Sequence, residues 1–287
     1  MRRLLIALFS VIILANLALF VFRYTTIEKK LETYQGPPEV SPVVESTEHR
    51  YRIAIVLDDL GVKTPDYHLL NDIAYKLNLA VIPGLKNSKE LVREMAQDPR
   101  YELLLHMPME PLRRSGDMES GAQSLTHNYP FLITHNLSKR SVRKILDQAF
   151  DAIDGYGVVK GMNNHMGSWI TSSTNMMAVI IDWAKKEHLY FLDSLTSRYS
   201  VAYEEARKQK VPAAYNEVFL DGIDSEDYIV GQLAKLIDKA KNDGQAIAIG
   251  HITRHYTLPV LIREMPKLVA SDNVEFVWVS ELLHFKE

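Results

Sequence analysis

Short runs of β-forming residues alternate with amphipathic helical patterns from residue 51 onward, and this alternation restricts the possible folds more than any other feature. The expected strands are Arg52–Leu57, Leu79–Ile82, Glu102–Met107, Val158–Gly161, Leu189–Leu192, Glu217–Leu220, Ala246–Ile249 and Val274–Val279. The expected helices are Ser88–Ala96, Ser141–Ile153, Asn175–Lys186, Tyr228–Lys241 and Leu258–Leu268, with Ser138 as an N-cap and Gly244 as a helix end. Repeated β-then-α units predict an α/β fold with seven or eight mostly parallel strands, a (β/α) barrel or an incomplete version of one.

The N-terminus carries the clearest local signal outside this region. After two arginines, an apolar run extends from Leu4 to Phe22 and is interrupted by only one serine and one asparagine. A helix of this length reaches about 28 Å, roughly the hydrocarbon thickness of a bilayer. We expect residues 1–22 to form a transmembrane helix that anchors the chain in the cell membrane. The alternative is a cleaved signal peptide, which would leave a secreted protein.

The rest of the chain divides into two parts. Residues 23–50 contain Gly36-Pro37-Pro38 and Ser41-Pro42, which favour an extended, unpacked linker. Residues 51–287 are numerous enough to bury a substantial core as one domain. Because the N-terminal tail is short, a single-pass topology with this domain on the extracytoplasmic side is favoured.

Composition excludes several classes of function. Cysteine is absent, so disulfide scaffolds, thiolate metal sites and cysteine nucleophiles are excluded. The chain has 33 Lys and Arg against 36 Asp and Glu, which is not the basic balance of a nucleic-acid-binding protein, and we expect no nucleic acid partner. No dinucleotide fingerprint, P-loop or serine nucleophile elbow is present. The sequence predicts no particular oligomeric state.

Carboxylates and imidazoles recur at the ends of the expected strands. They are Asp58, Asp59, His106, His165, Asp193, Asp221 and His251. In parallel α/β folds the carboxyl ends of the strands form one active-site face, so we expect these side chains to converge on one rim. Any one of them could instead cap a helix or make a structural contact, but together they favour a functional site.

The residue types at this rim indicate metal chemistry. Histidine and aspartate without cysteine suit zinc or another borderline divalent ion. Three protein ligands would leave positions for water and a substrate carbonyl, and a nearby carboxylate could take the proton. Asp58 and Asp59 point to opposite sides of a regular strand. A bend at the strand end, with Gly61 two residues on, could bring both to the rim, one as a ligand and the other as a base.

Five segments carry most of these residues: Ile55-Val-Leu-Asp-Asp-Leu-Gly61, Leu105-His-Met-Pro-Met-Glu-Pro111, Gly161-Met-Asn-Asn-His-Met-Gly-Ser168, Phe191-Leu-Asp-Ser194 and Ala248-Ile-Gly-His251. Together they resemble the divergent polysaccharide deacetylase family, from about Tyr51 to the C-terminus. The resemblance implies a NodB-like, irregular (β/α) barrel related to metal-dependent carbohydrate esterases. Those enzymes remove N- or O-acetyl groups from chitin-like or peptidoglycan sugars.

The resemblance also implies roles for individual residues. Mainstream deacetylases have an Asp-Asp pair in which the first is the base and the second a metal ligand, which corresponds to Asp58 and Asp59. Their His-x-x-x-His motif is half matched, because Glu110 stands where the second histidine is expected after His106. Their late Leu-x-His motif, whose histidine is the general acid, resembles Ile249-Gly-His251, whereas their acetate-binding Arg-x-Pro-Tyr motif has no counterpart. We take His165 as the candidate for the missing imidazole.

The predicted site therefore has three groups of residues. They are the catalytic residues Asp58 and His251, the metal ligands Asp59, His106 and His165, and the substrate-binding residues Glu110, Asn164, Asp193 and Asp221. The expected cofactor is a divalent metal, with zinc favoured, and the expected partner is an acetylated glycan. Simpler roles remain open: Glu110 could pair with Arg113 or Arg114, and Trp169 could stack on a sugar or pack internally.

Two functions from different classes follow from these observations. The first is a metal-dependent hydrolase that removes acetyl groups from a cell-envelope polysaccharide or oligosaccharide. The second is a catalytically impaired glycan-binding or envelope regulatory protein on the same barrel. The imperfect His-x-x-x-His match favours the second function, and the presence of Asp58, Asp59, His165 and His251 opposes it.

Overall fold

The computed structural model of the protein describes residues 50–62, 67–112, 129–153 and 157–283. The expected membrane anchor and nearly all of the expected linker lie outside these residues, so the topology stays a prediction. Within the described ranges, no helix combines the length and the apolar character that crossing a membrane requires.

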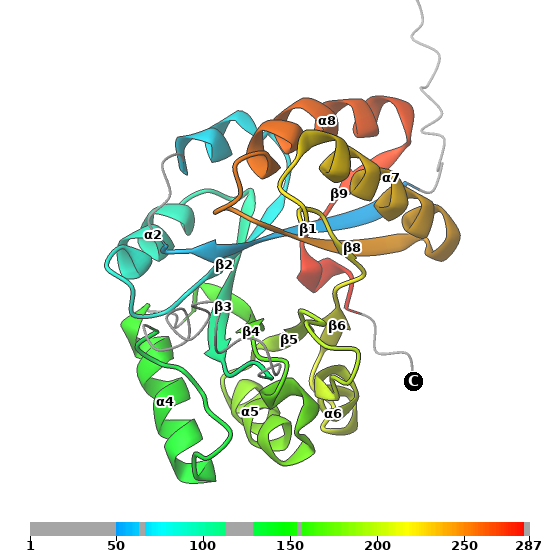
Figure 1. Ribbon diagram of the computed structural model, residues 1–287. Coiled ribbons are helices and arrows are strands. Elements are labelled where there is room, and N and C mark those ends of the chain that lie inside the picture. The colour runs from blue at the N-terminus through cyan, green and yellow to red at the C-terminus, as the bar shows by residue number, and fades with distance from the viewer. Residues whose placement is uncertain (1–49, 63–66, 113–128, 154–156, 284–287) are drawn as a thin grey trace, which may run out of the picture. The chain divides into compact units, whose positions relative to one another are not determined.

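Among the described residues, nine strands form one sheet, in which every neighbouring pair is parallel (Figure 1). They are β1 (Tyr51–Leu60), β2 (Leu77–Val81), β3 (Tyr101–Met109), β4 (Val159–Met166), β5 (Tyr190–Asp193), β6 (Ala213–Tyr215), β7 (Val218–Phe219), β8 (Gln245–His251) and β9 (Val274–Phe276). The order is β6-β5-β4-β3-β2-β1-β8-β7, and β9 pairs with β1. The predicted parallel α/β fold is confirmed, with nine strands instead of seven or eight.

The two ends of this strand order lie close together in the sequence. Only two residues separate β6 from β7. The amide of Asn216 donates to the carbonyl of Asp193 at 2.8 Å, and the amide of Glu217 donates to the carbonyl of Ile247 at 3.1 Å. One extended segment therefore passes from β5 to β8, so the sheet curls round into an incompletely closed barrel.

The helices cover the outer surface of the curled sheet (Figure 1). They are α2 (Ser88–Met95), α4 (Lys139–Ala152), α5 (Thr174–Lys186), α6 (Ala202–Lys208), α7 (Glu226–Asp243) and α8 (Thr257–Ser271). The 3-10 turns are η1 (Tyr67–Asp72), η2 (Ile170–Ser172) and η3 (Val279–Glu281), of which η3 packs on the inner side of the sheet. Two expected helix signals are confirmed. The Ser138 hydroxyl accepts from the Ser141 amide at the start of α4, and Gly244 ends α7 with a φ of 80°.

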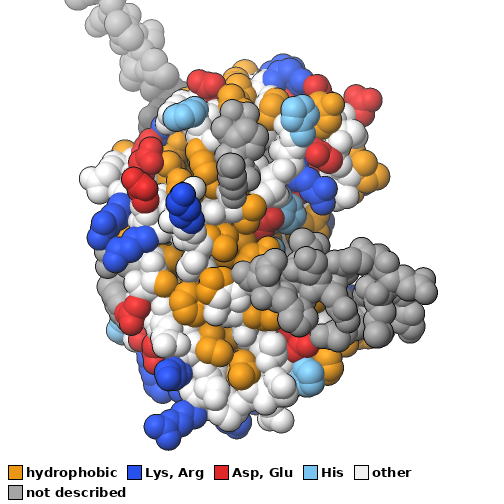
Figure 2. All heavy atoms as spheres, turned by 60° about the vertical axis from the view of Figure 1, so that its left-hand side comes forward, with side chains coloured by type: hydrophobic (Ala, Val, Ile, Leu, Met, Phe, Trp, Pro, Cys, Tyr) orange, Lys and Arg blue, Asp and Glu red, His pale blue; other side chains and the backbone are white. Residues whose placement is uncertain are grey.

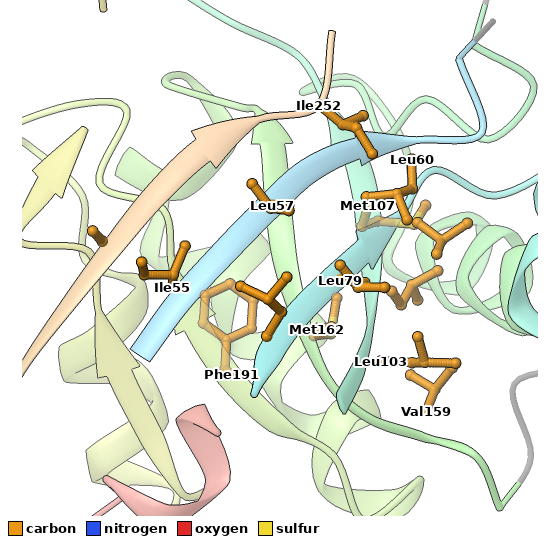
Figure 3. Packing of buried hydrophobic residues seen from close by; sticks show 14 of the residues in the cluster. Ile55, Leu57, Leu60, Leu79, Leu103, Met107, Val159, Met162, Phe191 and Ile252 are labelled. Atoms are coloured by element: carbon orange, nitrogen blue, oxygen red, sulfur yellow. The ribbon is translucent and has the colours of Figure 1, made fainter. Parts of the chain in front are cut away.

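Alternate residues of each strand face opposite sides of the sheet, and both sides are apolar. The outer side packs against the helices, and its residues include Ile55, Leu57, Leu79, Met107 and Phe191 (Figure 3). The inner side forms a smaller cluster that includes Ala54, Val56, Leu104, Leu192 and Ile249, together with Val279 and Leu282 from the C-terminal segment. This alternation determines which polar residues can enter the mouth of the barrel.

Candidate functional site

The end of β1 departs from regular strand geometry. Asp59 has a φ of 69°, and the register between β1 and β2 shifts between Leu57 and Leu60. The expected bend is therefore present, and it centres on Asp59. As a result the Asp59 carboxylate turns toward β3 and β4, while Asp58 stays level with His251 on β8.

Three predicted metal ligands meet at this bend. The Asp59 Oδ1 atom lies 2.9 Å from His165 Nδ1 and 3.4 Å from His106 Nε2. The two ring nitrogens are 3.2 Å apart. Potential ligand atoms of these residues all lie within 4.8 Å of one another. The strands β1, β3 and β4 each supply one of them, and β2 lies between β1 and β3 in the sheet.

The neighbouring Asn163 orients both a ligand and the predicted base. Its Nδ2 donates to Asp58 Oδ1 at 2.8 Å, and its Oδ1 accepts from His106 Nδ1 at 2.7 Å. A carboxylate only accepts, so the amide nitrogen must face Asp58 and the amide oxygen must face the imidazole. The proton of a neutral His106 ring is thereby held on Nδ1, and the Nε2 lone pair is directed at Asp59 and His165.

Asn163 is a site residue that the sequence analysis missed. It pairs in register with His106 and is fully buried. The signal was available in the two-residue period of a strand, because a residue two positions before His165 shares its face. By the same rule Asn164 belongs to the opposite face.

The donor set fits a divalent cation. Asp59 Oδ1 is buried and accepts no well-aligned hydrogen bond, although imidazole nitrogens lie 2.9 and 3.4 Å away. Atoms bound at about 2.0–2.2 Å to a tetrahedral ion are themselves about 3.3–3.6 Å apart, close to the spacing seen here. Lone pairs of Asp59, His106 and His165 face one another, and they repel unless a cation or a proton lies between them. Two imidazoles and one carboxylate suit zinc and other first-row divalent ions.

The two adjacent aspartates differ in their electrostatics. Burial raises the pKa of Asp58 above its usual 3.8, more than the attraction of His106 and His251 lowers it. Burial acts in the same direction on Asp59, but the imidazoles of His106 and His165 close to its carboxylate outweigh burial and hold the Asp59 pKa well below 3.8. The Asp59 carboxylate therefore loses its proton more readily, which suits a metal ligand, and Asp58 is the better proton acceptor.

The predicted acid, His251, is held by Asp221. Its Nδ1 lies 2.8 Å from Asp221 Oδ1, and its backbone amide donates to Asp221 Oδ2 at 2.5 Å. The Thr257 hydroxyl donates to the same oxygen at 2.6 Å. Burial disfavours the charged imidazole, but the bond to Asp221 and the nearby carboxylates outweigh burial and raise the pKa of His251 to about 9. His251 is thus protonated at neutral pH, and Asp221 positions it.

Glu110 lies outside the group of three metal-ligand candidates. Its Oε2 accepts from the backbone amide of His135 at 2.8 Å and lies 2.7 Å from the same residue's Nδ1. The His135 ring stacks on Trp169 with centroids 3.8 Å apart. His135 is therefore one partner of Glu110, whereas Arg113 and Arg114 lie outside the described residues.

Asn164 and Asp193 make their contacts with the end of β4 and with the loop after β5. Asn164 donates to the carbonyl of Met166 at 2.6 Å and accepts from the amide of Ser194 at 3.0 Å. Asp193 accepts from the amide of Leu195 at 2.9 Å. Their predicted role in binding substrate stays a prediction, since these hydrogen bonds go to the protein's own backbone.

Histidine and acidic side chains lie side by side on the face shown in Figure 2, next to a central group of hydrophobic side chains. Most lysines and arginines on this face lie nearer its outline.

Comparison with known proteins agrees with this arrangement. A protein of Haemophilus influenzae described as uncharacterised is 31% identical over 242 residues, covering 80% of this chain and 78% of the relative. The crystal structure of the uncharacterised protein ATU2773 from Agrobacterium tumefaciens C58 is similar with a TM-score of 0.71 and 20% identity, covering 83% of this chain and 91% of that one.

A second solved structure is more distant. It is a BA3943 mutant described as a CE4 family pseudoenzyme with restored enzymatic activity, and it is similar with a TM-score of 0.51 and 15% identity, covering 82% of this chain and 68% of that one. At these identities the two structures establish a shared fold alone. The sequence model of the divergent polysaccharide deacetylases matches residues 55–283, which include every predicted site residue. The chain therefore belongs to the divergent polysaccharide deacetylase family.

Proposed function

We propose that this protein is a metal-dependent hydrolase that removes acetyl groups from a polysaccharide or oligosaccharide of the cell envelope. The observation that carries the proposal is the meeting of Asp59, His106 and His165 beside a buried carboxylate and a protonated imidazole. Metal-assisted hydrolysis of an amide or ester requires metal ligands, a general base and a general acid close together, and these groups lie at the mouth of the barrel. Family membership supports the choice of an acetylated sugar as the substrate.

The proposed division of labour follows from the contacts. Asp59, His106 and His165 would hold a divalent ion, for which zinc is our choice. Such an ion, when bound, polarises the acetyl carbonyl and lowers the pKa of water. Asp58 accepts the proton of the attacking water, and the hydrogen bond from Asn163 keeps its carboxylate oriented.

His251 supplies the proton for the leaving group. Attack of water on the acetyl carbon forms a C–O bond, and the bond from that carbon to the sugar nitrogen or oxygen then breaks. The imidazolium donates its Nε2 proton to the departing amine or alcohol, while Asp221 holds the Nδ1 proton. The products are acetate and a deacetylated sugar.

We also propose an extracytoplasmic location, either attached to the cell membrane through residues 1–22 or secreted after cleavage. The apolar run that follows the two N-terminal arginines supports this location. A glycan of the envelope would be accessible there.

The second candidate is a glycan-binding protein without turnover. Glu110 favours it, because the position of the second motif histidine holds a carboxylate that is bound to His135. The description of BA3943 as a CE4 family pseudoenzyme supports this candidate, because a protein of similar fold is described there as lacking activity in its unmutated form.

Acetate release by the full-length protein separates the two candidates. The zinc-loaded protein is incubated with acetylated oligosaccharides, and Asp58→Asn is compared with wild type. Asp58→Asn keeps the shape of the side chain but not its basicity, so turnover should fall by about 10²–10⁴-fold with zinc content unchanged. Asp72→Asn, an exposed aspartate on η1, is the matched control and should keep full activity. Binding of sugars without any acetate release would support the second candidate.

A further inference from the structure

Left-handed backbone conformations cluster at the mouth of the barrel. In the described ranges the non-glycine residues with positive φ are Asp59, Met166, His188, Leu195, Lys210 and Asn273. Three of them, His188, Lys210 and Asn273, directly follow the C-cap residues of α5, α6 and α8, where this conformation is an ordinary way to end a helix. The other three stand at the carboxyl ends of β1, β5 and β4, and such backbone strain concentrates at functional sites.

Leu195 is the member of this group that the proposed chemistry does not explain. Asp59 is a metal-ligand candidate, and Met166 directly follows His165. Leu195 has a φ of 53° although its side chain is bulky, and that side chain is 41% exposed. A left-handed conformation disfavours a bulky residue, and exposure forgoes the stabilisation that burial of leucine gives. Folding alone would therefore be served better by glycine here.

The loop that carries Leu195 is fixed to the metal-ligand strand. The Thr196 hydroxyl donates to the carbonyl of Met166 at 2.9 Å. The buried Asp193 accepts from the amide of Leu195 at 2.9 Å and from the Ser200 hydroxyl at 2.6 Å. These bonds hold both ends of the loop. The loop is consequently held beside the end of β4, where Met166 directly follows His165.

A second exposed apolar side chain stands on the same loop. Tyr199 is 60% exposed, and the Arg198 guanidinium lies 4.7 Å from the centroid of its ring. Arg198 also donates to the Tyr199 hydroxyl at 2.5 Å. The cation thus lies over the ring, and more than half of the Tyr199 surface remains exposed. We call Leu195 and Tyr199 together the apolar ledge.

We propose that the apolar ledge binds the sugar units of a glycan chain that neighbour the unit being deacetylated. The inference rests on the proposed function, because it takes the substrate to be a chain of acetylated sugars. The faces of a pyranose ring expose C–H groups that pack on aromatic and aliphatic side chains, and the Arg198 guanidinium offers donors to sugar hydroxyls. The rigid loop places this surface beside the ligand strand β4. The ledge therefore favours long substrates over short ones.

The test compares substrates of two lengths. Acetate release by the full-length, zinc-loaded protein is measured as kcat/KM for the dimer and the hexamer of β-1,4-linked N-acetylglucosamine. The variants are Leu195→Gly and Tyr199→Ala, with Val230→Ala as control, because Val230 is a similarly exposed residue (38%) on α7. In each ledge variant the hexamer-to-dimer ratio of kcat/KM should fall by about 2–13-fold, the size of one apolar ring contact, while the dimer value stays unchanged.

Stability separates ligand binding from a structural role. Leu195→Gly relieves the left-handed backbone, so its Tm should not fall, whereas a structural leucine would lower the Tm when removed. An unchanged hexamer-to-dimer ratio in both ledge variants overturns the inference, as does a ratio that falls equally in Val230→Ala. If Tyr199→Ala instead changes the oligomeric state measured by light scattering, the ledge is a contact between copies and the inference is wrong.

Failure of the proposed function gives a different result. In that case wild type releases no acetate from either oligomer, and dissociation constants replace kcat/KM in the same comparison. Loss of hexamer affinity in Leu195→Gly and Tyr199→Ala then supports the ledge on a binding protein. Equal affinities in all variants, or no binding by wild type, overturn it.

Discussion

Two adjacent asparagines with different surroundings offer the sharpest test of the site. Replacing Asn163 by leucine, which has a similar volume, removes the acceptor for His106 Nδ1 and the donor to Asp58. Both partners are buried, and an unmade hydrogen bond to a buried group costs about 1–3 kcal/mol. Without Asn163 the His106 ring can also carry its proton on Nε2, and this nitrogen, which faces Asp59 and His165, then cannot bind a metal.

We therefore expect Asn163→Leu to weaken zinc binding by roughly 10–100-fold, the usual effect of removing a group that orients a histidine ligand. This loss corresponds to about 1.4–2.8 kcal/mol. Zinc affinity of the full-length protein is measured at neutral pH by competition with a chromophoric chelator. Circular dichroism establishes that the variant is folded.

Asn164→Leu is the matched control. Asn164 holds the carbonyl of Met166 and the amide of Ser194, so its replacement should lower the Tm. Zinc affinity should stay close to that of wild type, since neither contact involves a ligand side chain. The reasoning is refuted if the two variants bind zinc equally well, or if Asn164→Leu loses more affinity than Asn163→Leu.

Two further predictions concern pH and backbone geometry. His251 must be protonated to act as an acid, and its pKa is raised to about 9, so kcat/KM should fall as the pH rises through about 9. Asp221→Asn should move this alkaline limb of the pH profile toward 6.5 and leave the acidic limb in place. An alkaline limb that does not move in this variant contradicts the role of Asp221. At Gly61, which has a φ of 101°, an added Cβ would meet Ser88 Oγ at 2.5 Å, so Gly61→Ala should lower the Tm. At Gly231 on α7 an added Cβ would meet nothing within 4 Å, so Gly231→Ala should raise the free energy of unfolding by about 0.5–1 kcal/mol, measured by chemical denaturation. Equal effects of Gly61→Ala and Gly231→Ala on stability would contradict this account.

The parts of the fold that follow from local patterns could be predicted from the sequence. Apolar runs located most strands, and Ser138 and Gly244 marked helix ends through hydrogen bonding and backbone conformation. The convergence of Asp59, His106 and His165 followed from one rule, that parallel strands present their carboxyl ends at one edge. No long-range contact had to be known for either inference.

Other features depend on contacts between distant segments. The strand β6 was not expected, because its three residues, Ala213–Tyr215, are recognisable only through their pairing with β5. Glu110 and His135 pair across a long stretch of sequence that shows neither helical nor strand periodicity. No rule of sequence spacing relates these two residues. Asn163 is different, because the two-residue period that links it to His165 was readable in the sequence.

The position of His165 explains how a broken motif can coexist with three metal-ligand candidates at one point. In a His-x-x-x-His motif both imidazoles come from one chain segment, whereas here Glu110 occupies the second place and points to His135. His165 pairs in register with Pro108, midway between His106 and Glu110, on the adjacent strand β4. Neighbouring parallel strands are about 4.8 Å apart, so a side chain from β4 reaches the same point. The replacement of the second histidine therefore leaves two imidazoles at the mouth, and it makes their geometry depend on the register between β3 and β4.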